Sequence, residues 1–183
     1  MSLWQKLFGK KDEQAALDPL SDLTLSNLKV GYLVDYDLKT WQVKGQSSYT
    51  FDDTKTQEWE LDAGDDSFFL EREEDDGVEW NISRKIDFSV LGQGIRAHIE
   101  QHDDPPEEIE YQGIRFRLVE SGAGYYHPNG RVAGDEMIYW DYTDASEDNT
   151  LTIEQWDEDE FEAAVGKYVN EYEFSHILPR EKS

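Results

Sequence analysis

One template of bulky apolar and aromatic residues occurs twice in the chain, and this repeat limits the folds that the chain can adopt. The residues Tyr36, Trp41 and Val43 are matched 75 positions later by Tyr111, Phe116 and Leu118. The residues Trp59, Leu61, Leu70 and Trp80 are matched 81 positions later by Trp140, Tyr142, Leu151 and Phe161. Because displacing a buried ring leaves a cavity, rings kept at fixed spacing indicate interior packing. The repeat therefore predicts two copies of one folding unit, with these residues as its core.

Around this template, bulky and polar residues alternate, which is typical of β-strands. In the first copy the pattern predicts strands over residues 31–36, 40–51, 57–61, 68–72 and 78–82. In the second copy it predicts strands over residues 109–111, 114–126, 136–142, 151–156, 161–165 and 168–174. The second copy holds six additional residues, which we assign to an elongated hairpin around residues 125–130.

The predicted fold class is mainly β, with α+β character at the margins. We expect two tandem antiparallel β-meander repeats that pack together through their aromatic faces, because a single meander leaves one apolar face uncovered. Residues 95–100 are expected to form a short helix between the repeats. The expected organisation is an N-terminal amphipathic segment and linker (1–20), a first β repeat (21–86), a connecting segment (87–106), a second β repeat (107–178) and a tail (179–183).

The first eleven residues differ from the rest of the chain because they carry a formal charge of +3, which leaves −28 for the remainder. A short amphipathic helix there would place its apolar residues on one face, which can enter a lipid headgroup boundary while lysines meet phosphates. Alternatively, the apolar face packs on a partner protein or on the protein's own core. The residues expected to make the membrane or partner contact are Leu3, Trp4, Lys6, Leu7, Phe8, Lys10 and Lys11.

Acidic residues dominate the charge, with 42 Asp and Glu against 17 Lys and Arg and a net charge of −25. Such a field repels nucleic acids at long range, so we expect no nucleic-acid partner. It attracts cations, and carboxylates together with aromatic rings can bind polyamines. The alternative is that the acids are solvated surface residues and serve solubility. The chain has no cysteine, which excludes disulfides and thiolate metal sites.

Two patterns could hold a metal ion, and neither is complete. His98 and His102 are four positions apart, but zinc requires three or four converging ligands. Residues 144–149 begin like a calcium loop, but Asn149 stands where glycine is required and Gln155 where the bidentate acid belongs. The sequence contains no phosphate-binding loop, nucleophile elbow or dinucleotide-binding fingerprint. We therefore predict no metal, no cofactor and no catalytic residue, although an unrecognised carboxylate pair stays as a weaker alternative.

Several strings resemble a known bacterial family, domain of unknown function 4178. In the first half they are residues 28–31, Tyr36 and residues 41–45, and in the second half residues 140–142, 151–156 and 161–166. The resemblance extends over about residues 28–178, and we interpret the protein as two tandem copies. It implies a compact β-rich unit and supplies no catalytic residues. Members of this family resemble accessory proteins encoded in gene clusters, so the resemblance implies an accessory role. The same clusters encode phage-shock and ESCRT-III-like membrane-remodelling proteins, small membrane proteins and aminopropyltransferase-like enzymes.

The expected function is that of a non-enzymatic accessory or adaptor protein acting with membrane-associated or membrane-remodelling partners. The alternative is a binding module for polyamines or other small cations. No apolar run is long enough to span a bilayer, and the N-terminus lacks a secretory signal, so a cytoplasmic location is expected, peripheral at the inner membrane if the N-terminal segment binds lipid.

Overall fold

The computed structural model describes residues 22–51 and 54–179 and confirms a mainly β protein. The first half contains β1 (Leu33–Tyr36), β2 (Lys39–Phe51), β3 (Thr54–Asp62), β4 (Ser67–Glu74) and β5 (Val78–Ile86). The second half contains β6 (Glu108–Tyr111), β7 (Ile114–His127), β8 (Asp135–Asp144), β9 (Asn149–Asp157) and β10 (Glu160–Val169). A final strand, β11 (Ser175–Leu178), follows β10.

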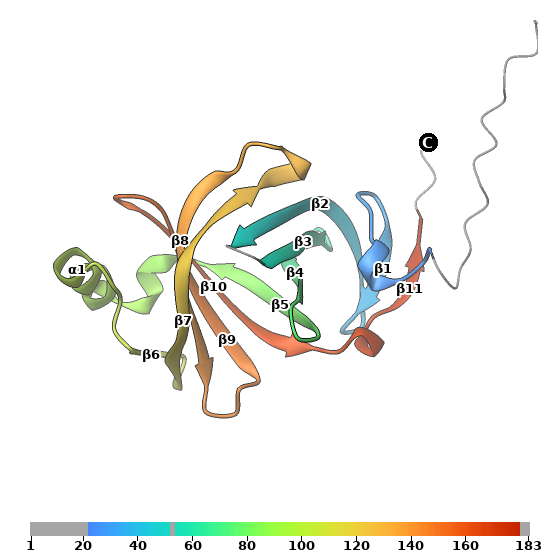
Figure 1. Ribbon diagram of the computed structural model, residues 1–183. Coiled ribbons are helices and arrows are strands. Elements are labelled where there is room, and N and C mark those ends of the chain that lie inside the picture. Colours follow the sequence, from blue (N-terminus) through green and yellow to red (C-terminus); the bar gives the residue numbers. More distant parts are fainter. Residues whose placement is uncertain (1–21, 52–53, 180–183) are drawn as a thin grey trace, which may run out of the picture.

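Short helices lie between and beside the strands. The predicted inter-repeat helix is present as α1 (Gln93–His102), preceded by the 3-10 turn η3 (Phe88–Leu91). Further 3-10 turns are η2 (Leu25–Asn27), η4 (Pro128–Gly130) and η5 (Glu171–Glu173). In Figure 1, α1 lies at one end of the molecule, and β1 and β11 lie at the opposite end.

The strands form one antiparallel sheet that closes on itself. Its order is β11-β1-β2-β3-β4-β5-β10-β9-β8-β7-β6, and β2 additionally pairs with β7 (Figure 1). The strands from β2 round to β7 therefore make a closed ring, while β1, β11 and β6 continue beyond it. The closing pair is short, with Ser48, Tyr49 and Thr50 opposite His127, Tyr126 and Tyr125. Closure matters because it removes two strand edges and turns one face of every ring strand inward.

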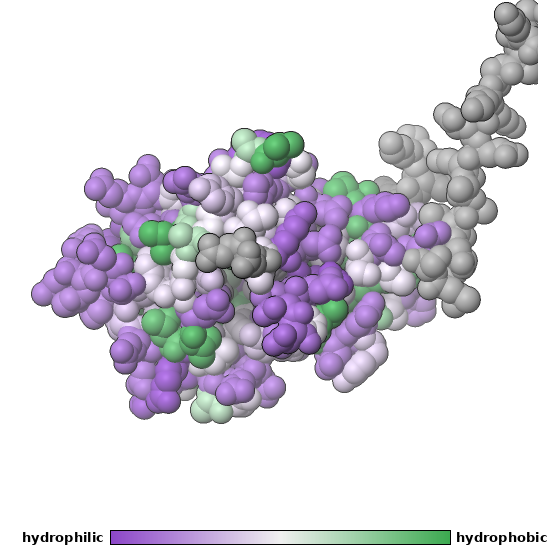
Figure 2. Space-filling model, viewed as in Figure 1, coloured by the Kyte–Doolittle hydropathy of each residue, from purple (hydrophilic) through white to green (hydrophobic). Residues whose placement is uncertain are grey.

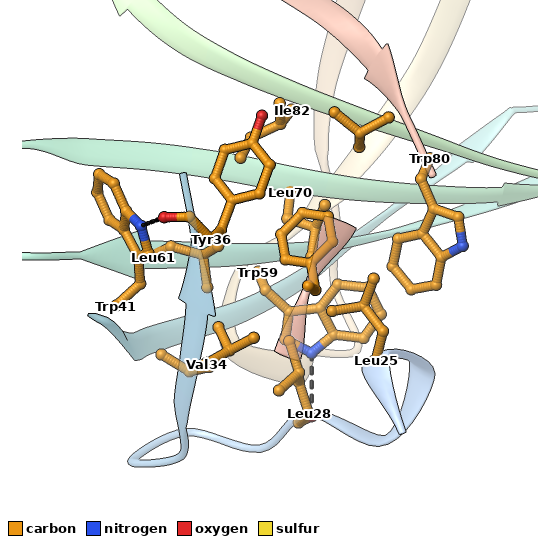
Figure 3. Close-up of a cluster of buried hydrophobic side chains, with 13 residues drawn as sticks. Leu25, Leu28, Val34, Tyr36, Trp41, Trp59, Leu61, Leu70, Trp80 and Ile82 are labelled. Carbon is orange, nitrogen blue, oxygen red and sulfur yellow. Dashed lines mark hydrogen bonds between the residues drawn. The ribbon is translucent and has the colours of Figure 1, made fainter. Parts of the chain in front are cut away.

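Two separate apolar clusters lie on the other face of these strands. The first is formed by the first half together with Val169 and Phe174, and Figure 3 shows Trp41, Trp59 and Trp80 among its members. The second is formed by the second half together with η3 and α1. The expectation that the two halves pack through their aromatic faces is therefore wrong. The template rings of each half lie in or against that half's own cluster. The halves are joined by strand pairing, together with the ring contacts Tyr49–Tyr126 and Phe51–Tyr139.

The two halves have the same strand order and share one bulge. β1 to β5 follow one another in the sheet as β6 to β10 do, and the halves join where β5 pairs with β10 and β2 pairs with β7. A bulge interrupts β2 between Val43 and Gly45, and another interrupts β7 between Leu118 and Glu120. These bulges are 75 positions apart, the spacing of the template in this region.

The C-terminal region differs from the prediction of a strand over residues 168–174. β10 extends to Val169, and the chain then makes η5 before β11 begins at Ser175. Asn170 and Glu173 form a capping box at this turn, which interrupts the extended chain. The backbone N–H of Asn170 donates to Glu173 Oε1 at 2.7 Å. The amphipathic helix predicted within the first eleven residues and the polar end of the tail lie outside the described residues.

Candidate functional site

The inner face of the ring encloses a cavity of about 160 Å³. Its polar lining residues generally alternate along the strands with the residues of the apolar clusters, although Tyr142 and Ala163 belong both to the lining and to the second cluster. On β3, for example, Glu58 lines the cavity whereas Trp59 belongs to the first cluster. On β9, Glu154 lines the cavity whereas Ile153 belongs to the second cluster. This alternation follows from the two-residue period of a strand, so the residues that flank the core point together into the cavity.

The cavity is strongly acidic. Its carboxylates come from six strands and are Glu58, Glu71, Glu73, Glu120, Asp141, Glu154 and Glu162. Within the described chain, Lys85 is the one cationic side chain that lines it. Seven carboxylates facing one lysine leave a large excess of negative potential in a partly enclosed space, where water screens charge less than at an open surface.

Three pairs of these acids stand directly opposite each other on neighbouring strands. Glu58 is paired with Glu71 between β3 and β4, and Glu154 with Glu162 between β9 and β10. Glu120 is paired with Asp141 between β7 and β8. Like charges directly opposite in an antiparallel pair are destabilising. The arrangement therefore opposes folding of the empty protein, and a bound cation would relieve the repulsion.

The enclosed position of these acids raises their pKa values. Burial is the largest cause for Glu154, whose pKa rises from 4.5 to about 7, with repulsion from Glu58 and Glu162 adding to it. Burial likewise raises the pKa of Asp141 to about 6 against the opposing hydrogen bond from Thr152. For Glu71, burial and the charge of Glu58 raise the pKa well above its usual value.

Glu71 has no hydrogen bond or ion pair among the described residues, although its side chain lies half-buried against the cavity. Glu58, by contrast, is 5% exposed and is held by two tyrosines at the seam between β2 and β7. Tyr49 donates to Glu58 Oε2 and Tyr126 donates to Glu58 Oε1, both at 3.3 Å. The two rings contact each other with centroids 4.9 Å apart. The seam therefore holds the carboxylate of Glu58 by two hydrogen bonds, whereas the carboxylate of Glu71 is left to bind a ligand.

The seam is tightly packed. A Cβ atom on Gly124 would lie 2.4 Å from the ring of Phe51 and 2.9 Å from the backbone oxygen of Thr50, so a side chain has no room there. His127, expected at a hairpin tip, is the last residue of β7, and its Nε2 lies 3.0 Å from the hydroxyl of Thr50. The extra residues of the second half thus help to close the ring.

Lys85 lies against both a carboxylate and a ring. Its ammonium group donates to Glu162 Oε2 at 2.5 Å and lies 5.3 Å from the ring centroid of Phe69. Burial alone would lower the pKa of Lys85, but the hydrogen bond to Glu162 and the charges of Glu162, Glu154 and Glu58 raise it above its ordinary value. An ammonium group is therefore stable in this position.

The core residues predicted from the template lie in the two clusters, one cluster for each half. Those of the first half are Tyr36, Trp41, Val43, Trp59, Leu61, Leu70 and Trp80. Those of the second half are Phe116, Trp140, Tyr142 and Leu151, with Tyr111, Leu118 and Phe161 packed against them. The membrane- or partner-contacting residues proposed at positions 3–11 lie outside the described residues.

The two incomplete metal patterns have structural partners of their own. The rings of His98 and His102 contact each other on α1, and His98 Nδ1 lies 2.8 Å from the backbone oxygen of Asp104. Asp144 accepts hydrogen bonds from Asn149 and Ser146 within the β8–β9 turn, which lowers its pKa to about 2. In the described ranges, no group of three His, Asp or Glu side chains is placed to hold a metal ion.

The cavity residues are not among the site residues predicted from the sequence, although the sequence contains a signal for them. Glu58 precedes Trp59 and Glu71 follows Leu70, so acids flank core positions on strand after strand. Such a pattern is usual for a strand with one buried and one solvated face. Its meaning changes only when the sheet closes, and closure rests on a three-residue pairing that periodicity does not reveal.

The chain belongs to the family described as Domain of unknown function (DUF4178), which it matches over residues 29–171. This one match extends over both halves of the sheet. An uncharacterised protein from Aquifex aeolicus is 32% identical over 177 residues, which cover 96% of each chain. No solved structure matches. Among the residues that the structure describes, no helix has the length and apolar character needed to cross a membrane.

Proposed function

We propose that this protein is a non-enzymatic binding module that holds a small organic cation, such as a polyamine, in the acidic cavity of the ring. The observation that carries the proposal is the set of three acid–acid pairs that face the same enclosed space. Acids paired in this way reduce stability unless a counter-charge is present. Because a bound cation removes this repulsion, the stability lost in the free protein is recovered on binding and adds to the affinity for the cation.

The distribution of the carboxylates favours a cation with several separate charges. They are spread over β3, β4, β7, β8, β9 and β10 and do not converge on one point. A polyamine carries ammonium groups along a flexible chain, so each can meet a different carboxylate in a charge-assisted hydrogen bond. Phe69, Tyr49 and Tyr168 also line the cavity and offer apolar contact to the methylene groups between the charges.

Titration calorimetry with spermidine tests this proposal. At a salt concentration of about 0.15 M, where surface charges are largely screened, we expect saturable binding to the wild-type protein. Glu71→Gln keeps the shape of the side chain but removes the unpaired charge, and we expect about a tenfold loss of affinity. Glu110→Gln, at an exposed position on edge strand β6, is the matched control and should bind as the wild type does.

Two results would contradict the proposal. Heat that disappears at this salt concentration would indicate a diffuse ion atmosphere around an acidic protein and no specific site. Equal losses in Glu71→Gln and Glu110→Gln would mean that net charge, and not the cavity, determines binding.

We also propose that the two halves are tandem copies within one family unit. Arg84 pairs with Val165 and Thr50 pairs with Tyr125, at separations of 81 and 75 positions, which are the two spacings of the template. A residue paired with its own counterpart lies on a two-fold relation between the copies. Superposition of the halves in an experimental structure tests this, and core Cα atoms that do not superpose would contradict it.

The adaptor function predicted from the first eleven residues stays a prediction. Their apolar residues and lysines are the observation in its favour. Deleting residues 1–11 should abolish co-sedimentation with vesicles containing anionic lipid. Unchanged co-sedimentation together with a lower free energy of unfolding would instead support packing of this segment on the protein's own core.

A further inference from the structure

The acidic cavity adjoins a second hollow, and the boundary between them is occupied by one ion pair. The second hollow, here called the α1 groove, has a volume of about 650 Å³ and lies between the end of β5, η3, α1 and β10. Lys85 and Glu162 line both the cavity and the α1 groove. A molecule moving from the groove into the cavity would therefore pass the contact between these two side chains.

This boundary is accessible and only weakly held. The side chains of Lys85 and Glu162 are 51% and 38% exposed, so solutes can reach them. Ion pairs with this degree of exposure contribute little to stability because water competes for both charges. A second ammonium group can therefore replace that of Lys85 at small cost.

The surroundings of the Lys85 ammonium group are those expected of a site for an alkylammonium ion. Glu162 accepts its hydrogen bond, the ring of Phe69 lies beneath it, and the paired acid Glu154 stands opposite Glu162. A cation over an aromatic face and beside carboxylates is a recurrent mode of amine recognition.

The α1 groove is suited to the apolar part of such a ligand. Phe88 and Phe161 stack there with centroids 5.1 Å apart. The guanidinium of Arg96 lies 4.9 Å from the ring of Phe161 and covers one side of this pair. The groove therefore offers aromatic surface next to the acidic cavity, with the Lys85–Glu162 contact between the two.

We infer that the position of the Lys85 ammonium group is a subsite for a primary ammonium group of the ligand, which displaces Lys85 from Glu162. The ligand class is accordingly a linear primary amine with further ammonium groups, held partly in the cavity and partly in the α1 groove. This inference rests on the proposed cation-binding function and specifies its ligand. Lys85 acts in the free protein as a tethered competitor.

The test removes the competitor and supplies a simple substitute. In Lys85→Ala, n-butylammonium should bind Glu162 and raise the melting temperature saturably, with an affinity about fivefold above that for the wild type. 1-Butanol lacks the charge and tetramethylammonium cannot donate hydrogen bonds, so neither should reproduce the effect. Spermidine affinity should also increase in Lys85→Ala. The control Lys44→Ala removes the same charge from an exposed position on β2 and should change either affinity by less than about twofold.

Two outcomes overturn the inference: n-butylammonium affecting wild type and Lys85→Ala equally, or spermidine that binds the wild type but gains no affinity when Lys85 is replaced. If Lys85→Ala does not fold, Lys85→Met retains the straight stem, and its spermidine affinity must still rise. A different result would contradict the proposed polyamine function without contradicting the subsite. If no spermidine binding is seen in any protein while n-butylammonium selects Lys85→Ala, the subsite stands and the polyamine function falls.

Discussion

The apolar clusters and the acidic cavity are built from the same strands, yet they act on folding in opposite directions. On β3, Trp59 is fully buried in the first cluster, and its indole nitrogen donates to the backbone oxygen of Leu28 at 3.0 Å. On the same strand, Glu58 faces the paired acid Glu71. Burial of the ring stabilises the fold, whereas the facing carboxylates reduce its stability.

The outer surface adds a third environment. Figure 2 shows a face that is mostly hydrophilic, with small and separate hydrophobic areas. Acids there are solvated and contribute little beyond solubility. The acids of the cavity differ because burial raises their pKa values, as for Glu154 and Asp141. The comparison teaches that the position of an acidic residue, and not the overall acidity of the chain, distinguishes the proposed binding surface from the solvated one.

The largest expected effect comes from removing a ring from either cluster. Trp59→Ala and Trp140→Ala should each lower the free energy of unfolding by about 3–5 kcal/mol, since each leaves a large cavity. Each also loses an indole hydrogen bond, to Leu28 in the first half and to Asp104 Oδ1 in the second. Urea denaturation measures the loss. Tyr172→Ala is the control, because its side chain is 84% exposed, and it should change little.

A loss below about 1 kcal/mol in one of the two tryptophan variants would break the equivalence of the clusters. It would mean that one half supplies most of the stability and that the other is held mainly by strand pairing.

A smaller effect is expected from pH, with the sign set by the cavity. The folded-state pKa of Glu154 is raised from 4.5 to about 7 and that of Asp141 from 3.8 to about 6. Between the ordinary and the raised values the folded protein binds more protons than the unfolded chain, so stability falls as pH rises. From about pH 5 to about pH 8 the free energy of unfolding should decrease on the order of 2 kcal/mol.

Denaturation at a series of pH values measures this slope, and Glu154→Gln should flatten it. Stability that is constant or that rises over the same range would show that the cavity acids are solvated like those of the surface.

The smallest expected effect is a gain in stability when one cavity acid is neutralised. At about pH 8 and without ligand, Glu71→Gln should raise the free energy of unfolding by about 1 kcal/mol, because it removes the charge opposite Glu58. At lower pH the gain should shrink, because burial and the charge of Glu58 raise the pKa of the Glu71 carboxyl above its usual value and so favour its protonated form. Thermal denaturation of both proteins measures the difference. Glu110→Gln, outside the cavity, should show no gain at either pH, and a loss of stability in Glu71→Gln would refute the repulsion argument.

The sequence by itself determined β1 to β10 in outline, the helix between the halves and the template residues that lie in or against both apolar clusters, but not η5 or β11. These follow from local periodicity and from ring spacing, because a strand of alternating residues has one face to bury wherever it lies. The template even placed Trp59 and Trp140 at equivalent positions of two clusters.

Tertiary structure alone decided whether the acidic face of these strands is a solvated surface or the lining of a cavity. Glu58, Glu71 and Glu154 read as solvated residues until Tyr49 pairs with Tyr126 and closes the ring around them. This closure is a contact between residues 77 positions apart in the sequence, and no local pattern encodes it. The same alternation that buries the rings therefore makes either an ordinary surface or an enclosed acidic site, and the difference depends on whether two distant strand edges meet.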